Sequence, residues 1–447
     1  MLRGKSGERE KREREKRGEW ERGGKDRNFV RKGKDRMMLH HFLWVLLSAC
    51  VTPATPAAPG GTLWGAIRWD AFVNSTTSPS DPGVITARVL TPEVWHDRLP
   101  WFSYIDPQSG NVTFDERSPS VMAAEIEMAV AAGIDHWAFD VYPPESDLSS
   151  ALYAYLNSSS PAKASLFFCL LLQSSWMSSG GLPAWPAKVA LYAAHFARAE
   201  YRTVLDNRPL VYLFAVEEGA FGGAGWEGWA EALTALEQAS LAAGRGAPYI
   251  VIQCWSAAQG LAQLKGINAA GGAPLVAALS SYALLGATEE GTPFADFARG
   301  GVGFWDSLAA TGVDVIPPVA AGWDPRPRNM TPVPWAPYQD PAYVVMPTPT
   351  ELGDFVQSAL DWTAQHLKSN PTRCHLLSAW NVRPSSLTPS LFLCVWGALP
   401  PLTKQNNLPT TPPFPRQEYD EGHFISAVLP QFGGNARLSA IGRVLRP

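Results

Sequence analysis

The feature that most constrains the fold of this chain is a regular alternation of short apolar segments with longer amphipathic ones. After Gly61, each apolar, β-branched or aromatic run is followed by a segment whose apolar residues recur at helical spacing, the signature of successive βα units. We predict strands over Trp64–Asp70, Ile134–Tyr142, Ala164–Gln173, Pro209–Val216, Tyr249–Trp255, Leu275–Tyr282, Val313–Val319 and Leu376–Asn381.

The helical segments fall between and after these strands. We predict helices over Pro119–Ala132, Ser149–Leu156, Trp185–Tyr201, Trp226–Ala243, Ala257–Ile267, Phe294–Thr311, Thr350–Leu367 and Ala436–Leu445. Eight strands alternating with eight helices favour an α/β fold of one domain, a (β/α)₈ (TIM) barrel formed by residues 61–381 and 418–447, over a doubly wound sheet. The first strand is not followed by a G-x-G-x-x-G motif, which argues against a nucleotide-binding fold.

The N-terminal part differs from the rest in composition. Residues 1–36 hold 15 Lys and Arg and 8 Asp and Glu with almost no apolar content, so we expect a disordered extension, which a gene model starting upstream of Met37 or Met38 would add. Residues 37–60 join a short apolar core to an Ala-rich and Pro-rich end, as in a secretory signal peptide. The alternative is a type II membrane anchor. The chain is therefore expected outside the cell or in the ER or Golgi lumen, and on a membrane only if this segment stays uncleaved.

Charge and cysteine usage restrict the partners. Without residues 1–36 the chain carries 22 basic and 33 acidic residues, which argues against a nucleic-acid ligand. Cys169, Cys254 and Cys374 lie in or beside strand segments and are expected to be buried free thiols. Sequons at Asn74, Asn111, Asn157 and Asn329 suit a secreted glycoprotein. We expect a monomer.

Polar and aromatic residues gather where the predicted strands end. In a (β/α)₈ barrel the site is built at the C-terminal ends of the strands. Taken strand by strand, the candidates are Arg68, Trp69, Asp70, Asp140, Tyr142, Gln173, Trp176, Glu217, Gln253, Trp255, Tyr282, Trp323, Asp324, Arg328, Trp380 and Asn381. A strand-end acid is often a helix cap and a strand-end Trp is often packing, but acids, amides and rings at one mouth are what a carbohydrate site requires. The histidines show no metal-ligand spacing, so we expect neither metal nor cofactor.

Two carboxylates follow the last predicted strand. Trp380-Asn381 and Glu418-Tyr419-Asp420-Glu421-Gly422 read as one motif divided by residues 382–417. Glycoside hydrolysis uses such a pair, one carboxyl group to protonate the leaving oxygen and one to assist attack. Glu418 and Asp420 lie close enough in sequence to raise the pKa of Glu421 by like-charge repulsion, as a general acid requires.

These motifs resemble a known family. Trp64–Asp70, Ala131–Asp140, Gly322–Arg328 and the divided motif are similar to the glycoside hydrolase family 99-like proteins, a superfamily that includes the WbsX-like polysaccharide-biosynthesis proteins and lies near the family 71 α-glucanases. The resemblance covers residues 62–381 and 418–445. It implies a metal-independent retaining endo-α-mannosidase on a (β/α)₈ barrel. It assigns Glu418 as the base on the substrate 2-hydroxyl, through a 1,2-anhydro-sugar intermediate, and Glu421 as the general acid/base. Tyr419-Asp420 replaces the family's Trp-His.

The segment 382–417 is Pro-rich, with eight prolines and neither Asp nor Glu. A loop of this length inside a barrel is unusual. It starts at Val382 and ends at Gln417, whose codons can supply the GT and AG of an intron, and its length preserves the reading frame, so a retained intron is one interpretation. A lid beside the site is the other.

The sequence thus predicts a secreted or lumenal retaining glycoside hydrolase that acts on an α-linked oligo- or polysaccharide, in the manner of an endo-α-mannosidase. The alternatives are a non-catalytic carbohydrate-binding barrel and an accessory protein of polysaccharide biosynthesis.

Overall fold

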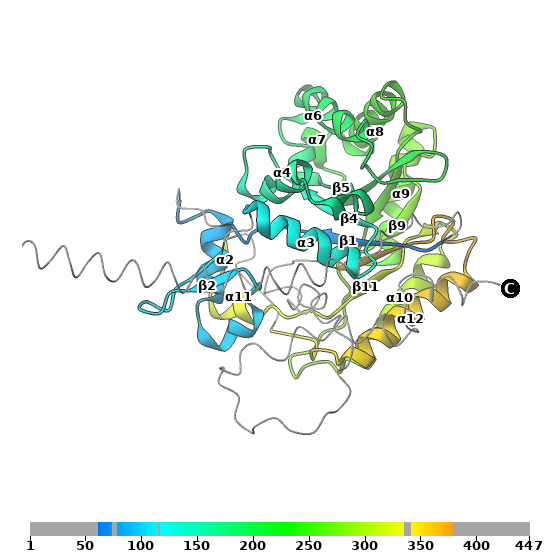
Figure 1. Ribbon diagram of the computed structural model, residues 1–447. Helices are drawn as coiled ribbons and strands as arrows, with labels where there is room; N and C mark the ends of the chain where they lie inside the picture. Colours follow the sequence, from blue (N-terminus) through cyan, green and yellow to red (C-terminus); the bar gives the residue numbers. More distant parts are fainter. Residues whose placement is uncertain (1–60, 74–77, 115–116, 335–340, 379–447) are drawn as a thin grey trace, which may run out of the picture. The chain divides into compact units, whose positions relative to one another are not determined.

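The computed structural model describes residues 61–73, 78–114, 117–334 and 341–378 (Figure 1). The predicted segments 1–36, 37–60 and 382–417, and the predicted last helix at Ala436–Leu445, lie outside these residues. Within them each predicted strand and each of the other predicted helices has an observed counterpart. The parallel strands are β1 (Leu63–Arg68), β4 (His136–Val141), β5 (Phe167–Gln173), β7 (Arg208–Phe214), β8 (Tyr249–Gln253), β9 (Ala278–Ser280), β10 (Asp314–Val315), β11 (Pro318–Ala320) and β12 (Cys374–Ser378).

The parallel strands lie in chain order around a closed sheet. Their pairing runs β10-β9-β8-β7-β5-β4-β1-β12-β11, and its two ends belong to one stretch of chain. β10 pairs with β9 and β11 pairs with β12, while Ile316 and Pro317 bridge them: the Ile316 amide donates to Leu279 and the Pro317 carbonyl accepts from Leu376. Because Pro317 and Pro318 have no N–H to donate, the seventh strand cannot pair continuously with one neighbour. The predicted (β/α)₈ barrel is confirmed, with its seventh strand divided between two partners.

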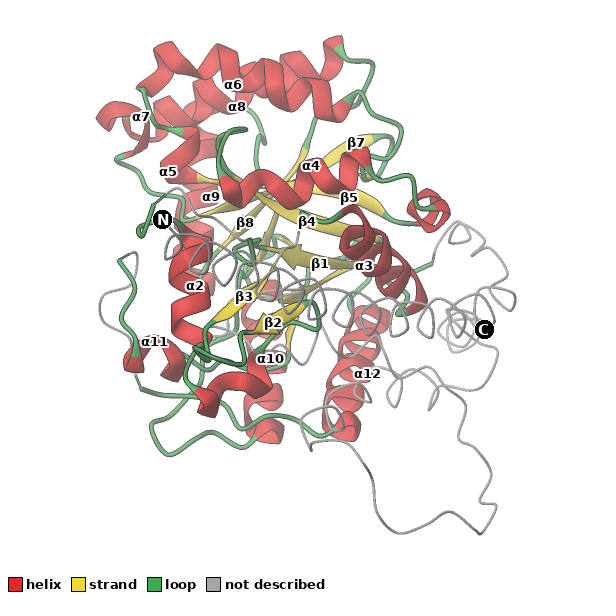
Figure 2. Ribbon diagram, turned by 60° about the vertical axis from the view of Figure 1, so that its left-hand side comes forward, coloured by secondary structure: helices red, strands yellow, loops and turns green. Residues whose placement is uncertain are grey.

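Helices surround the strands (Figure 2). The helices that follow the barrel strands are α3 (Pro119–Ala131), α4 (Ser150–Asn157), α6 (Gly181–Phe196), α8 (Gly225–Ala242), α9 (Ala257–Gly271), α10 (Phe294–Ala309) and α12 (Pro349–Gln365). In the described part of the chain, no helix is long and apolar enough to cross a membrane.

Local sequence explains where these helices begin. At α12 the Thr348 hydroxyl accepts from the Glu351 amide, and the Glu351 carboxylate accepts from the Thr348 amide, a capping box with Pro349 in the first turn. At α9 the Ser256 hydroxyl accepts from the Gln259 amide, and Gly272 ends the helix at φ 63°. Each pattern gives free backbone groups a partner at the helix end.

Large aromatic side chains lie in the layer between sheet and helices. Trp137, Trp229 and Trp305 are fully buried, and the Trp305 indole N–H donates to the Pro318 carbonyl at 2.9 Å, which fixes α10 to the seventh strand. Cys169, Cys254 and Cys374 are buried free thiols, as predicted.

Our prediction has no strand or helix between the first strand and α3, but the described residues of this segment form several elements. It forms α2 (Pro82–Leu90), the 3₁₀ helix η1 (Glu93–Arg98) and an antiparallel hairpin of β2 (Ser103–Ile105) and β3 (Val112–Phe114). Its small core is separate from that of the barrel and consists of Phe72, Leu90, Trp95, Val112 and Phe114. Three-residue strands are too short to show a period-2 pattern, which is why they were missed.

Buried histidines make the fold sensitive to acid. His375 is fully buried, with Nε2 at 3.0 Å from the Ala359 carbonyl and its ring stacked 4.4 Å from Trp64. Burial lowers the pKa of His375 to about 4, and that of His195 also to about 4. In the unfolded chain a histidine has its ordinary pKa near 6.5. The unfolded state therefore binds more protons between pH 6.5 and pH 4, and stability is lost as the pH falls through this range.

We expect the free energy of unfolding to fall by about 3 kcal/mol per buried histidine between pH 7 and pH 4, measured by urea denaturation. His375→Gln keeps a donor for Ala359 but cannot titrate, so its loss should be smaller by about that amount. His96→Gln, at a half-exposed position, is the control. An equal acid-induced loss in wild type and His375→Gln would contradict this assignment.

Candidate functional site

The register of the strands shows which side chains face the barrel interior. Trp64 stacks on His375, whose ring contacts Ala359 and Thr363 of α12, so both side chains point outward to the helices. Alternation along β1 then turns Arg68 outward and Trp69 inward. Ala66 points outward like Trp64, and so does its register partner Trp137 on β4. Alternation along β4 then places the Asp140 side chain in the barrel interior.

A row of register partners crosses the C-terminal ends of four strands. Gln173 pairs with Phe214, Phe214 with Gln253, and Gln253 with Ser280, and each is the last residue of its strand. Register partners in a parallel sheet point to the same face, and this face is the barrel interior. We call Gln173, Phe214, Gln253 and Ser280 the strand-end row.

Four of the predicted site residues meet at one end of this row. The Trp69 indole donates to the Tyr142 hydroxyl at 2.6 Å, and Gln173 Nε2 donates to that hydroxyl at 2.9 Å and to Asp140 Oδ2 at 3.0 Å. The Tyr142 hydroxyl lies 3.3 Å from the same carboxylate oxygen. The ends of β1, β4 and β5 thus hold one hydrogen-bonded group that fixes the Asp140 carboxylate and presents polar atoms at the mouth.

Aromatic rings lie at the other strand ends. The rings of Phe214 and Tyr282 have centroids 4.4 Å apart, and Phe214 meets Trp255 edge-on at 6.1 Å. Trp255 is 38% exposed, whereas Phe214 and Tyr282 are half-buried. We call Phe214, Trp255 and Tyr282 the aromatic platform. Accessible aromatic surface beside hydrogen-bonding groups suits a ligand that has one apolar and one hydroxylated face.

Arg68 and Asp70 lie elsewhere, in the layer between β1 and α3. The fully buried Arg68 donates from Nε to Asp70 Oδ1 at 2.8 Å and from Nη2 to Glu125 Oε2 at 2.6 Å, and its guanidinium lies 4.4 Å from the centre of the Trp137 ring. Burial raises the pKa of Glu125 to about 7, against the opposing charge of Arg68. The structure therefore places Arg68 on the outer face of the barrel wall. A substrate contact by Asp70 stays a prediction.

Asp324 is held by two arginines. Arg98 of η1 donates to Asp324 Oδ2 at 2.8 Å, and Arg326 donates to both carboxylate oxygens at 2.8 and 2.7 Å. Burial alone would raise the pKa of Asp324, but the hydrogen bond from Arg326 and the charge of Arg98 lower it. This clamp ties the loop after β1 to the loop after β11, and Ile85, Val89 and Val333 pack together as a small core between the same two segments. A direct substrate contact by Asp324 stays a prediction.

The other predicted residues are dispersed. Glu217 is exposed because β7 ends at Phe214 and Ala215 takes a φ of 54°, which turns the chain away earlier than expected.

Trp176, on α5 (Ser174–Met177), is half-buried, and the centre of its ring lies 4.3 Å from the Lys188 ammonium. Arg328, on α11 (Arg326–Met330), is buried, which lowers its pKa to about 10, with Tyr282 near enough to oppose the shift. Trp323 is half-buried. Trp380, Asn381, Glu418 and Glu421 lie outside the described residues.

No family model and no curated protein matches the chain. Among solved structures, the chain is similar to the GH99 endo-α-mannosidase from Bacteroides thetaiotaomicron in complex with Bis-Tris-propane, with 14% identity and a TM-score of 0.44 over 73% of this chain and 85% of that one. A second structure of a GH99 endo-α-mannosidase from that organism gives 13% identity and a TM-score of 0.42, over 73% and 86% of the two chains.

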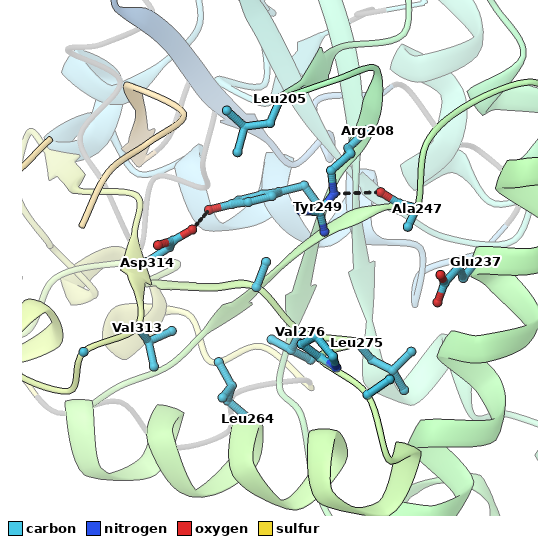
Figure 3. Close-up of a pocket in the computed structure, with 14 residues that line it drawn as sticks. Leu205, Arg208, Glu237, Ala247, Tyr249, Leu264, Leu275, Val276, Val313 and Asp314 are labelled. Carbon is cyan, nitrogen blue, oxygen red and sulfur yellow. Dashed lines mark hydrogen bonds between the residues drawn. The ribbon is translucent and has the colours of Figure 1, made fainter. Parts of the chain in front are cut away.

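One pocket lies at the opposite end of the barrel (Figure 3). Its volume is about 570 Å³, and its walls include Arg208, Tyr249 and Asp314, which begin β7, β8 and β10. The Tyr249 hydroxyl donates to Asp314 Oδ2 at 2.8 Å, and Arg208 donates to the Ala247 carbonyl at 2.9 Å. The first contact reaches from β8 across β9 to β10, and the second joins β7 to the residues before β8. Both lie at the N-terminal face, the end of such a barrel that serves stability rather than catalysis. We assign this pocket to the scaffold.

Sequence reasoning did not select Phe214, Ser280 or Lys188. The first two are the true last residues of strands that were expected to run two residues further, to Val216 and Tyr282. Lys188 donates to the carbonyls of Trp176 and Ser179, both at 2.6 Å, and so holds the loop after β5. Its position inside a helical pattern offered no signal of that contact.

The clamp generates a prediction about stability. Asp324→Asn removes the buried carboxylate partner of Arg98 and leaves only the exposed Asp97, and we expect the free energy of unfolding to fall by about 2–4 kcal/mol. Asp296→Asn is the matched control, because its ion pair with Arg299 is exposed and should change stability by less than about 0.5 kcal/mol. Chemical denaturation and glycan titration are run on both variants. Unchanged stability with weakened glycan binding for Asp324→Asn would show that Asp324 serves the ligand.

Proposed function

We propose that this protein is a secreted or lumenal retaining glycoside hydrolase that cleaves an α-linked oligo- or polysaccharide, in the manner of an endo-α-mannosidase. The observation that carries the proposal is the junction of the aromatic platform with the strand-end row at the catalytic end of a (β/α)₈ barrel. A sugar ring stacks on an aromatic side chain through its apolar C–H face and is bound through its hydroxyls by amides and carboxylates.

The described residues would bind and orient the glycan. Trp255 and Tyr282 supply ring faces, and Asp140, held by Gln173 and Tyr142, accepts hydrogen bonds from sugar hydroxyls. Because the barrel wall fixes these groups before the ligand arrives, little side-chain entropy is lost on binding. The chemical step is assigned, from the sequence motif, to Glu418 as base and Glu421 as acid/base.

A prediction follows for the aromatic platform. Trp255→Ala should weaken glycan binding by about 1–2 kcal/mol through loss of the stacking surface, with little change in stability because this ring is 38% exposed. Trp101→Ala is the matched control: that ring is 36% exposed and lies between η1 and β2, outside the platform. Calorimetric titration with α-mannan and α-glucan oligosaccharides measures both. Equal binding by the two variants would remove the platform from the site.

The activity is tested by reducing-end analysis after incubation with α-mannan, α-glucan and aryl α-glycosides. Glu421→Gln should lower turnover by about 10²–10⁴-fold without affecting folding, because it removes a proton donor. Glu231→Gln, an exposed substitution on α8, is the control. Turnover within threefold of wild type in Glu421→Gln would contradict its role. Glycan binding by the wild type without released reducing ends would favour the non-catalytic carbohydrate-binding barrel.

A further inference from the structure

Two neighbouring members of the strand-end row have unused hydrogen-bonding capacity. Gln253 and Ser280 are paired residues at the ends of β8 and β9, and they are 3% and 0% exposed. Gln253 Nε2 and Oε1 and Ser280 Oγ are buried and make no hydrogen bond to any residue in the described part of the chain. Buried side-chain polar atoms in folded proteins nearly always have a hydrogen-bond partner, so we infer that these atoms bond to a ligand.

The chemistry of the two side chains defines that partner. A carboxamide offers both donors and acceptors, and a hydroxyl offers one donor and two acceptor sites. The members of the strand-end row carry no charge, so they favour a neutral ligand whose adjacent groups both donate and accept. Phe214, the register partner of Gln253, belongs to the aromatic platform, which adds an apolar surface beside the polar pair. Vicinal hydroxyls on one sugar ring meet these requirements.

We propose that Gln253 and Ser280 bind two neighbouring hydroxyls of one sugar unit and so determine which sugar the barrel accepts. This inference rests on the proposed function and specifies its selectivity. A site built to hydrogen-bond a hydroxyl discriminates strongly against the analogue that lacks it, because its own polar groups are then left unsatisfied. The arrangement of hydroxyls that matches the pair is therefore preferred over its epimers.

Another buried glutamine shows what a structural role looks like. Gln263 on α9 is 7% exposed and donates from Nε2 to the Val216 carbonyl at 2.7 Å, joining α9 to the loop after β7. Replacing Gln263 by Met removes that bond and leaves a buried carbonyl unsatisfied, which destabilises the protein. Replacing Gln253 by Met removes two unsatisfied atoms and keeps the shape of the side chain. Gln263→Met should therefore lower stability, whereas Gln253→Met should leave it unchanged or raise it.

The test compares Gln253→Met, Ser280→Ala and the control Gln263→Met in the full chain. Urea denaturation should give an equal or higher midpoint for the first two variants and a lower one for the control. Methyl α-mannoside, methyl α-glucoside and their monodeoxy analogues are the probes for calorimetric titration. Wild type should lose about tenfold in affinity, equivalent to about 1.4 kcal/mol, when the recognised hydroxyl is absent. Gln253→Met and Ser280→Ala should bind the parent glycoside and its deoxy analogue equally.

The outcomes separate this inference from the proposed function. If Gln253→Met lowers the midpoint as Gln263→Met does, the pair is bonded to another part of the chain and the inference is overturned. If wild type and variants show the same preference among the deoxy analogues, the inference fails while the glycan site stands. If wild type binds none of the sugars and releases no reducing ends from α-mannan or α-glucan, the proposed function fails and this inference fails with it.

Discussion

The closure of the barrel depends on one stretch of chain that pairs with two neighbours in turn. β10 pairs with β9, and after two intervening residues β11 pairs with β12. Tandem prolines remove the amide donors that a continuous pairing would need, so the segment passes from one neighbour to the other at Pro317. Closure fixes the register of every strand, and the register in turn determines which side chains share the interior.

The candidate site is a consequence of that register. Gln173, Phe214, Gln253 and Ser280 are far apart in sequence, yet they align because each ends its strand and pairs with the next. A shift of one residue in any strand would turn its member of the row outward to the helices. The positions of these four side chains are therefore fixed by the sheet and do not depend on loop conformation.

The sequence predicted the barrel because each βα unit repeats a strong pattern, and it predicted Asp140, Tyr142 and Gln173 at the mouth because parallel strands end at one face. It could not resolve strand ends to within two residues, so Phe214 and Ser280 were missed. Nor could it show that Arg68 points to α3. A strand that is buried on both faces shows no alternation of apolar and polar residues, so the sequence does not reveal which of its side chains point inward. Contacts between distant loops, such as Arg98 with Asp324, leave no local pattern at all.

The buried ion pairs and the unsatisfied buried amide and hydroxyl have different tasks in this molecule. Arg68 and Asp324 are buried ions, and each is satisfied by an opposite charge from the chain itself, so the layers they join stay in place whether or not a ligand is bound. An ion left unsatisfied in the interior would cost far more than an unsatisfied amide or hydroxyl. Unused hydrogen-bonding capacity at Gln253 and Ser280 is therefore tolerable, and it is the kind that a neutral, hydroxyl-rich ligand can fill. Gln253 and Ser280 are thus left for the ligand, while the ion pairs of Arg68 and Asp324 hold the barrel wall.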